Sequence, residues 1–512
     1  MSARATELDR VSSLPLMTDW PAHVRVAIIG TGFTGLTAVH QLRAAGITDF
    51  LLLERAPDLG GTWRDNTYPG IACDVPSHLY SLSFAPNPDW ARTFSDGRQI
   101  WEYMRKVGTD MGIDAVTAFG EEVLDATWDE QRQHWSITTT TLELTADAII
   151  DGSGVLCEPT YPGIPGLDQF QGQLFHSARW DHEHDLTGKR VAVIGTGASA
   201  IQIVPAIQPL VGKLTVFQRT PGWVMPRNDR DITDAERRLL RRVPAIQRLL
   251  RTAQDWQRDG VMHQVMHRRW IRRIAQTISL AYLRREIDDP ALRAKLTPDF
   301  EIGCKRILIT SAWYPALNQP NVSVETSAIS EVREHGVLTA DGVEHPVDAI
   351  VCATGFHVTD PPMAGRLHGR GGASLLEAWG DSPRAYRGVT TAGFPNLFRV
   401  GSIGTGTGHT SQIMQIESGM AYAVDALGTM DREGLASVEV SEAAQETYAR
   451  ELHEMVRDTV WVTGGCVSWY LDASGEPSAV WPSTARRYRA QTRRFDPQAY
   501  VVVRRAAVPV AA

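Results

Sequence analysis

Cysteine is scarce in this chain, and long apolar runs are absent. The five cysteines among 512 residues are widely spaced, none forms a Cys-x-x-Cys pair, and the odd number argues against a disulfide framework. We therefore expect all five to be free thiols, as in a reducing cytoplasm. No stretch of about 18 uninterrupted apolar residues occurs, so we expect no membrane-spanning segment. Residues 1–23 also lack the apolar run of a secretory signal peptide.

Positive charge is not in excess either. The formal net charge is −8, so no uniformly basic face is implied and we do not expect nucleic acid as a partner. Hydrophobic residues make up 43% of the chain and charged residues 21%, which is typical of a soluble globular protein. A chain of 512 residues exceeds one ordinary hydrophobic core, so we expect two or three domains.

Two segments each predict a strand, a helix and a second strand. The segments are residues 25–29, 36–45 and 50–54 in the first unit and 189–194, 198–207 and 214–217 in the second. Their short apolar runs are typical of buried parallel strands, and the stretches between them have helical periodicity. We therefore expect an α/β fold with two Rossmann-like dinucleotide-binding domains.

Each unit contains a glycine-rich turn between its first strand and its helix. The turns read Gly30-Thr31-Gly32-Phe33-Thr34-Gly35 and Gly195-Thr196-Gly197-Ala198-Ser199-Ala200. In a dinucleotide fold, the first glycine permits the turn, the second lets the backbone approach the pyrophosphate, and the third position allows close helix–strand packing. The pyrophosphate then lies at the helix N-terminus, where free N–H groups and the helix dipole favour anions. Thr34 adds a hydroxyl donor there.

The residue at the end of the second strand indicates which dinucleotide binds. Glu54 follows Gly30 by 24 residues, and a carboxylate there accepts both ribose hydroxyls of FAD or NAD. Arg219 follows Gly195 by the same 24 residues, and a guanidinium there clamps a 2′-phosphate. The second site should therefore prefer NADPH to NADH.

Two further segments narrow the class of protein. Residues 170–181 read Phe-Gln-Gly-Gln-Leu-Phe-His-Ser-Ala-Arg-Trp-Asp, and residues 60–74 contain Gly-Gly-Thr-Trp, then Tyr-Pro-Gly, then a closing Asp. Together with the two turns, these segments resemble the signatures of the type I Baeyer–Villiger monooxygenases, a family of class B flavoproteins. The resemblance covers about residues 25 to 490 and is weakest in an Arg-rich helical section.

The resemblance implies an FAD-binding domain with an NADP-binding domain inserted into it and a helical excursion within the insertion. We expect the FAD-binding domain at residues 1–157 and 385–512, the latter with a C-terminal substrate and NADP loop. The NADP-binding domain is expected at 158–384, with its helical segment at about 228–300. A Gly- and Pro-rich stretch at 152–166 is the candidate linker between the two domains.

The implied reaction uses O2 as co-substrate. NADPH reduces the flavin, O2 adds to give a C4a-peroxyflavin, and attack on a small-molecule ketone gives an ester or lactone; sulfides are expected to be oxidised too. From the scattered cysteines we expect a cytoplasmic enzyme. A monomer and a homodimer both remain open, as does whether the Arg-rich helices form a dimer contact or cover the core.

Site residues follow from the matched motifs. For FAD they are Gly30, Gly32, Phe33, Thr34, Gly35, Glu54, Gly61, Thr62, Trp63, Asp74, Tyr80, Val123 and Gln412. For NADP they are Gly195, Thr196, Gly197, Ala198, Ser199, Ala200, Arg219, Thr220, Lys305 and Trp469. Arg306 matches the family's active-site arginine, and Asp74 matches the carboxylate that holds it. A fixed cation there stabilises the negative charge of the adduct, which is often the largest catalytic effect.

The signature residues are Phe170, Gly172, His176, Trp180 and Asp181. We interpret His176 and Trp180 as structural or hinge elements between the domains and not as proton donors. His176 lies near two further histidines, at positions 182 and 184, but the cluster lacks the spacing and companion ligands of a zinc site, so we expect no metal.

Several positions depart from the family pattern. Asp181 stands where Pro is commoner, Thr67 stands where Arg often precedes Tyr-Pro-Gly, and residues 404–411 differ from those of ring-ketone specialists. Three alternative functions use the same two dinucleotide sites. The first is a class B monooxygenase acting on nitrogen or sulfur. The second, a flavin disulfide reductase, is disfavoured because it needs two nearby redox cysteines and none are present. The third is a non-catalytic FAD- and NADP-binding redox sensor.

Overall fold

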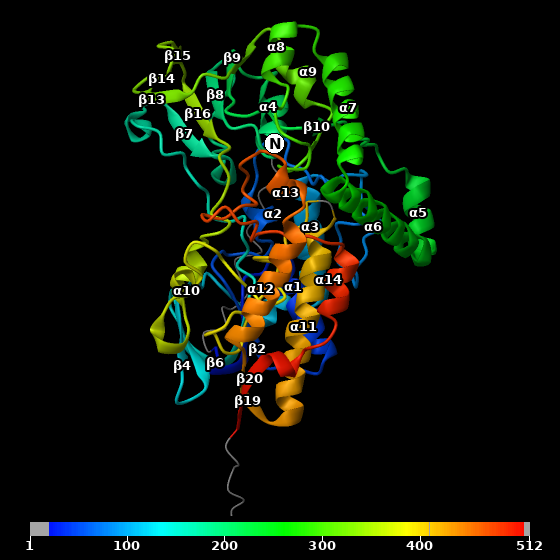
Figure 1. Cartoon of the computed structure of the whole chain (residues 1–512), viewed down its shortest axis with the longest axis vertical. Coiled ribbons are helices and arrows are strands. Elements are labelled where there is room, and N and C mark those ends of the chain that lie inside the picture. The colour runs from blue at the N-terminus through cyan, green and yellow to red at the C-terminus, as the bar shows by residue number, and fades with distance from the viewer. Residues whose placement is uncertain (1–19, 409, 506–512) are drawn as a thin grey trace, which may run out of the picture.

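The computed structural model describes residues 20–408 and 410–505, and it contains two parallel-sheet domains (Figure 1). We expected no signal peptide at residues 1–23, and only residues 20–23 of this stretch are described. Residues 506–512 also lie outside the described ranges. In Figure 1, β7, β8, β9 and β16 lie in the upper half, whereas β2, β4 and β6 lie in the lower half. The predicted α/β class is confirmed.

The first sheet has the strand order β17-β4-β5-β6-β1-β2-β3, with β18 also pairing with β6. Its strands are β1 (His23–Ile29), β2 (Phe50–Glu54), β3 (Thr117–Phe119), β4 (Val123–Asp129), β5 (His134–Thr139), β6 (Glu143–Asp151), β17 (Leu367–His368) and β18 (Leu397–Arg399). The strands β6, β1, β2 and β3 run parallel, while β5 pairs antiparallel with both β4 and β6. The apolar run of β1 is buried on both faces, as expected for a central parallel strand.

The second sheet is entirely parallel and has the order β12-β9-β8-β16-β7. Its strands are β7 (Gln173–His176), β8 (Arg190–Ile194), β9 (Lys213–Phe217), β12 (Val322–Glu325) and β16 (Ala349–Cys352). Smaller sheets are formed by β10 (Val224–Met225) with β11 (Leu308–Ile309), by β13 (Ile329–Arg333), β14 (Gly336–Thr339) and β15 (Glu344–Pro346), and by β19 (Leu435–Val440) with β20 (Tyr500–Arg504).

Helices pack around both sheets. The α-helices outside the Arg-rich segment are α1 (Phe33–Ala44), α2 (Thr62–Asp65), α3 (Gly97–Asp110), α4 (Ala200–Ile207), α9 (Trp313–Leu317), α10 (Leu375–Trp379), α11 (Gln412–Glu433), α12 (Glu442–Val456), α13 (Val460–Thr463) and α14 (Ala485–Gln491). The core around α1 joins residues from both ends of the chain, for example Ile28 and Leu36 with Tyr422 and Leu427. The first domain is therefore completed only after the second one has been inserted. No helix in the described ranges is long and apolar enough to cross a bilayer.

The Arg-rich segment forms four helices, α5 (Asp234–Arg242), α6 (Pro244–His267), α7 (Arg269–Glu286) and α8 (Pro290–Lys295). The helical pattern of residues 235–250 is broken at Val243, because Pro244 begins the next helix at a position that needs no N–H donor. The long α6 lies against the first domain through polar side chains. Asp255 accepts a hydrogen bond from Thr410 (3.0 Å), and Asp259 accepts one from the backbone of Ala485 (2.9 Å).

The chain returns to the first domain earlier than the boundary at 384 that the sequence suggested. The short strand β17 pairs with β4, and Leu375 and Trp379 are buried in the core of the first domain. The physical reason is that a two-residue edge strand and a five-residue helix carry no readable periodicity.

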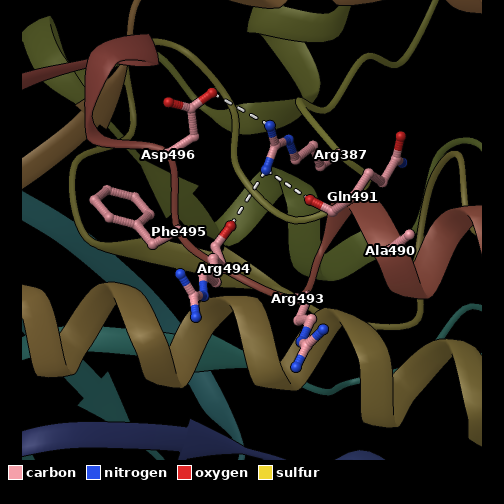
Figure 2. Close-up of a pocket in the computed structure, with 7 residues that line it drawn as sticks. All are labelled: Arg387, Ala490, Gln491, Arg493, Arg494, Phe495 and Asp496. Carbon is pink, nitrogen blue, oxygen red and sulfur yellow. Dashed lines mark hydrogen bonds and ion pairs between the residues drawn. The ribbon is translucent and has the colours of Figure 1, made fainter.

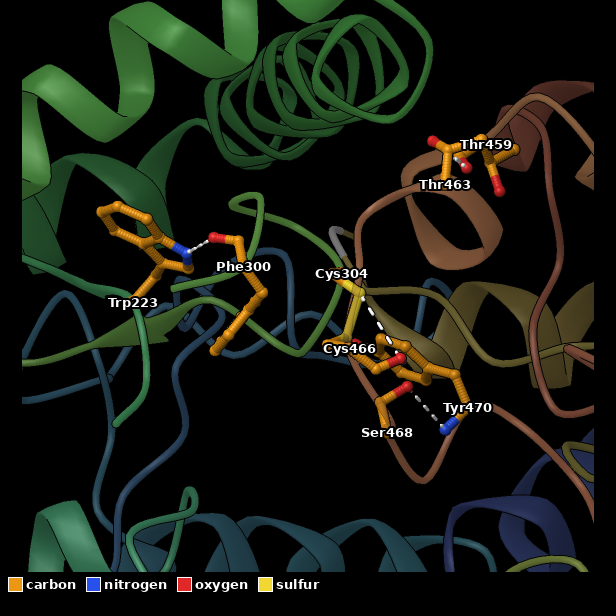
Figure 3. The surroundings of a disulfide bond; sticks show 8 residues. All are labelled: Trp223, Phe300, Cys304, Thr459, Thr463, Cys466, Ser468 and Tyr470. Carbon is orange, nitrogen blue, oxygen red and sulfur yellow. Dashed lines mark hydrogen bonds between the residues drawn. A yellow bond between two sulfur atoms is a disulfide. The ribbon is translucent and has the colours of Figure 1, made fainter. Parts of the chain in front are cut away.

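The expectation of five free thiols is wrong for two cysteines. Cys304 and Cys466 form a disulfide (Figure 3). Cys73, Cys157 and Cys352 are free. The two bonded residues are 162 positions apart, so no sequence spacing could reveal the pair.

Candidate active site

The first glycine turn has the geometry that a bound pyrophosphate requires. Gly30 has φ +90°, and a Cβ there would lie 2.8 Å from the carbonyl oxygen of Gly152. A Cβ on Gly35 would lie 2.3 Å from the carbonyl oxygen of Gly30, so only glycine lets α1 pack this closely. At Gly32, by contrast, an added Cβ would meet nothing within 4 Å, so open space lies beside the start of α1. Gly30 and Gly35 therefore sit in tight contacts, whereas Gly32 faces open space.

Several buried polar atoms of the described residues lack partners, and two of them, in Ser153 and Ser402, belong to residues next to glycines that touch this turn. Within the described residues, the buried hydroxyls of Ser153, Ser402 and Ser411 have no hydrogen-bond partner, and neither does the side-chain amide of Gln415. Ser153 follows Gly152, which touches the first turn, and Ser402 follows Gly401, whose Cβ position lies 3.7 Å from Thr34 Oγ1. Buried polar groups without partners are costly, so these atoms fit a polar cofactor at the turn. Sequence reasoning missed them because serine is common in loops.

Glu54 lies at the end of β2, as predicted, and its carboxylate faces the turn. It accepts hydrogen bonds from the backbone N–H (2.9 Å) and hydroxyl (2.6 Å) of Thr31, and it pairs with Arg64 at 3.0 Å. The backbone N–H of Glu121 donates to the carbonyl of Glu54 (2.9 Å), which brings the start of β4 with Val123 to the same edge.

The Gly-Gly-Thr-Trp segment lies directly over the first turn. A Cβ on Gly61 would lie 3.2 Å from the Cα of Gly32, and Thr62 begins α2. Trp63 donates from its indole N–H to the Tyr80 hydroxyl (3.0 Å), and the Tyr80 ring packs edge-on against Phe33. Gln412 begins α11 and donates to the hydroxyl of Thr405 (3.3 Å). The structure thus brings most predicted FAD residues to one region.

The second turn repeats this arrangement at the other sheet. Gly195 has φ +112° and a Cβ there would lie 2.5 Å from the carbonyl oxygen of Ala353, whereas a Cβ on Gly197 would meet nothing within 4 Å. Ala198 and Ser199 lead into α4, which begins at the buried Ala200. The Thr196 hydroxyl donates to the carbonyl of Thr220 (3.0 Å), which ties the turn to the segment after β9.

Two cations, Arg219 and Lys305, lie close enough beyond this turn to repel each other, and Asp299 partly offsets this repulsion at Lys305. Burial, and then the nearby charge of Arg219, lower the pKa of Lys305. The Lys305 ammonium lies 5.2 Å from the centre of the Phe300 ring, and neither cation has an ion pair among the described residues. Neighbouring like charges repel each other unless an anion joins them, so the pair fits a 2′-phosphate.

Asp74 and Arg306 form a bidentate ion pair between the two domains. The Arg306 Nη2 atom lies 2.8 and 2.7 Å from the two Asp74 oxygens, and Nε lies 3.1 Å from one of them. Asp74 raises the pKa of Arg306 against the opposing effect of burial. Burial disfavours the ionised form of Asp74, but Arg306 outweighs it and the pKa of Asp74 is lowered. Both groups therefore stay charged at neutral pH.

Two residues near this ion pair were not predicted. Arg258, on α6, donates to the backbone carbonyl of Asp74 (3.4 Å). Tyr470 is 2% exposed, and Arg306 opposes the rise that burial causes in the pKa of its hydroxyl. The neighbouring Trp469 is 44% exposed and packs against the Tyr470 ring, with centroids 4.4 Å apart. Arg258 was missed because, in an Arg-rich helix, the sequence does not show which arginine faces inward.

Side chains of the two domains also meet at the Tyr-Pro-Gly segment. The Tyr68 hydroxyl donates to Gln202 Oε1 (3.0 Å), and Gln202 Nε2 donates to the carbonyl of Ala72 (2.8 Å). Thr67, one of the departures from the family pattern, bonds to His182 (2.7 Å), the residue after Asp181. The Asp181 carboxylate itself accepts only a local backbone bond from Glu183 (3.0 Å).

The remaining signature residues build the edge of the second sheet. A Cβ on Gly172 would lie 2.4 Å from the carbonyl oxygen of Asp348 and 2.5 Å from the Phe170 ring, so both residues pack where β7 begins. Trp180 packs edge-on against Phe175 with centroids 4.9 Å apart. His176 is fully buried, and its Nδ1 accepts the N–H of Ala178 (3.1 Å). No group of three metal-ligating side chains occurs among the residues that the structure describes.

The buried His176 should make stability depend on pH. Burial, and then Arg179, lower its pKa from 6.5 to about 4, so the folded protein resists protonation that the unfolded chain accepts. The unfolded state binds more protons as pH falls from 6.5 towards 4, and stability is lost in that window. Between pH 7.5 and 5.0, we expect wild type to lose about 2 kcal/mol more unfolding free energy than His176→Gln. Urea unfolding at both pH values measures this.

The control for this experiment is His335→Gln, which changes an exposed histidine. This variant should lose stability on acidification as wild type does. An equal loss in wild type and His176→Gln would contradict a neutral, buried His176.

A pocket lies at the end of α14, and the contacts of Arg387 in it hold the chain in place (Figure 2). Arg387 donates to the carbonyls of Gln491 (2.6 Å) and Arg494 (3.3 Å) and pairs with Asp496 (3.2 Å). Its guanidinium therefore ties the chain after α14 together. None of the predicted site residues lines this pocket.

Comparison with known proteins gives concordant results. Residues 23–367 match the model of the flavin-binding monooxygenase-like family. A Baeyer–Villiger monooxygenase of Streptomyces coelicolor is 51% identical over 96% of this chain and 95% of its own. Another from Pseudomonas aeruginosa is 45% identical over 93% of this chain and 91% of its own. A crystal structure of OTEMO in complex with FAD and NADP superposes with a TM-score of 0.84 at 25% identity, covering 95% of this chain and all of the other.

Proposed function

Because the chain belongs to the flavin-binding monooxygenase-like family, we propose that it is an NADPH-dependent Baeyer–Villiger monooxygenase that uses FAD and O2. The reaction inserts one oxygen atom beside a ketone carbonyl and gives an ester or lactone. The observation that carries the proposal is the Asp74–Arg306 ion pair, which lies between two domains with one dinucleotide turn each. Likeness to Baeyer–Villiger monooxygenases along nearly the whole chain supports it.

The residues around the first turn fit FAD. Gly32 leaves open space for the pyrophosphate, and the unpartnered serine hydroxyls offer hydrogen bonds. Glu54 would bind the ribose, with Thr31 and Arg64 holding its carboxylate in place. When bound, the flavin supplies the oxygen-transfer chemistry, which no side chain of the protein can provide.

The residues around the second turn fit NADPH. Gly197 leaves room for the pyrophosphate, and Arg219 and Lys305 would grip the 2′-phosphate. Trp469 and Tyr470 close this side of the site from the C-terminal loop. In this proposal, the ion pair lies between the FAD-binding and the NADP-binding parts of the protein.

Arg306 has two tasks in this proposal. Its fixed positive charge stabilises the negative charge that develops on the carbonyl oxygen of the ketone, and it needs no reorganisation during the reaction. Asp74 orients the guanidinium through both of its oxygens and compensates its charge before substrate arrives. The Arg258 bond to the Asp74 carbonyl supports the same loop.

The substrate pocket is proposed to lie between residues 400–408 and the loop at 464–475. The backbone of Gly404 donates to Ser478 (2.9 Å), and Gly406 donates to Ala479 (3.0 Å), so the first segment is tied to the end of the C-terminal loop. We extend the proposal to sulfides, which accept the same oxygen atom. A cytoplasmic location and a monomer or homodimer are part of the proposal.

Product analysis tests the proposed function. We expect purified, yellow protein to oxidise NADPH under air and to convert members of a ketone panel into esters or lactones one oxygen heavier. Turnover of amines or sulfides alone would favour the heteroatom monooxygenase instead. Absence of NADPH-driven O2 consumption would favour a redox sensor. The disulfide does not favour a flavin disulfide reductase, because family membership extends over both domains.

A further inference from the structure

The disulfide joins the two segments that carry the candidate NADP and catalytic residues. Cys304 immediately precedes Lys305 and Arg306, and Cys466 lies three residues before Trp469. The bond therefore crosses from the second domain to the C-terminal loop. Nothing in the proposed reaction uses these sulfur atoms.

The loop is held closely before Cys466, whereas exposed side chains follow Cys466 until the buried Tyr470. Before Cys466, the backbone of Glu301 donates to the Gly464 carbonyl (2.9 Å), and a Cβ on Gly464 would lie 2.7 Å from the Cβ of Cys304. After Cys466, Val467 is 81% exposed and Trp469 is 44% exposed. The last firm attachment before Trp469 is therefore the covalent bond itself.

The two sulfur atoms differ in accessibility. Cys304 is fully buried in a cluster with Ile302, Val460 and Trp461, whereas Cys466 is partly exposed. A small thiolate can therefore reach the sulfur of Cys466 and displace that of Cys304. The buried cluster keeps Cys304 in position, so the bond can form again when the loop returns.

We propose that Cys304–Cys466 is a reversible thiol–disulfide modification site that controls the docking of the loop at residues 464–475. A dithiol reduces it: one dithiol sulfur bonds to Cys466 and releases the Cys304 thiol, then ring closure of the dithiol releases the Cys466 thiol. In the reverse direction, hydrogen peroxide takes two electrons and two protons from the thiols and leaves as two water molecules. The oxidised form keeps Tyr470 beside Arg306, and the reduced form releases the loop.

Thiol counting and hydrogen exchange on the flavin-loaded protein test this site. Iodoacetamide labelling in denaturant should modify three cysteines without reductant and five after dithiothreitol, with Cys304 and Cys466 as the two additional sites. Dithiothreitol should make amide exchange of residues 464–475 about tenfold faster in wild type. Cys466→Ser should exchange at the faster rate with or without reductant.

Cys157→Ser is the matched control, because it removes a partly exposed cysteine that is free. It should respond to dithiothreitol as wild type does. Five labelled cysteines in peroxide-treated, unreduced protein would overturn the inference, and so would loop exchange that reduction leaves unchanged. A higher KM for NADPH on reduction is also expected, but that readout depends on the proposed function. The thiol count and the exchange rates use no catalysis, so they decide the inference even if the proposed function fails.

Discussion

Arg306→Ala should lose ester formation by about 10²–10³-fold while NADPH still reduces the flavin. The variant removes the only partner of Asp74 in the bidentate pair and the fixed charge beside the reacting carbonyl. Reduction should survive because the variant leaves the proposed 2′-phosphate clamp, Arg219 and Lys305, unchanged. Stopped-flow absorbance follows flavin reduction, and chromatography of the product follows ester formation.

Two further variants sharpen this experiment. Arg306→Lys keeps a positive charge but cannot form the bidentate contact, so it should retain part of the activity. Arg285→Ala removes an exposed arginine that pairs with Glu286 and should behave as wild type. Undiminished ester formation in Arg306→Ala would remove Arg306 from the catalytic machinery.

Arg219→Ala should raise the KM for NADPH by about 10–100-fold and leave the KM for NADH nearly unchanged. Hydrogen bonds to a charged group contribute about 1.5–3 kcal/mol, which corresponds to that range. NADH lacks the 2′-phosphate, so it gains nothing from the guanidinium. Steady-state oxidation of both coenzymes measures the change in preference.

The control is Arg190→Ala in the same domain. Arg190 begins the central strand β8, at the opposite end of that strand from the glycine turn, and it is bound to Asp348 at 2.5 Å. This variant should keep the wild-type preference for NADPH. An unchanged ratio between the coenzymes in Arg219→Ala would show that the phosphate is bound elsewhere.

The local features of the fold were readable because they depend on short-range rules. A buried parallel strand requires an apolar run, and a tight turn at φ +90° or +112° requires glycine. Glu54 and Arg219 could be placed by counting, because each follows its first glycine across one strand–helix–strand unit of equal length.

The Asp74–Arg306 pair was identified by resemblance and not by spacing. Its members are 232 positions apart, and each, taken alone, is typical of an ordinary polar residue in a loop. The return of the chain at β17 was misplaced because a two-residue strand leaves no periodic signal. The inward-facing Arg258 was missed because it lies among many arginines that face solvent.

The sequence by itself determined the two dinucleotide units and the family signatures. It also determined that the second strand of one unit ends near a carboxylate, Glu54, and that of the other near a guanidinium, Arg219. Only the tertiary structure decided which distant side chains meet. It paired Asp74 with Arg306 across the domains, placed the unpartnered Ser153 and Ser402 next to glycines that touch the first turn, and joined Cys304 to Cys466. The physical reason is that backbone geometry follows from neighbours in the chain, whereas ion pairs, buried hydroxyls and disulfides depend on where folding brings remote segments together.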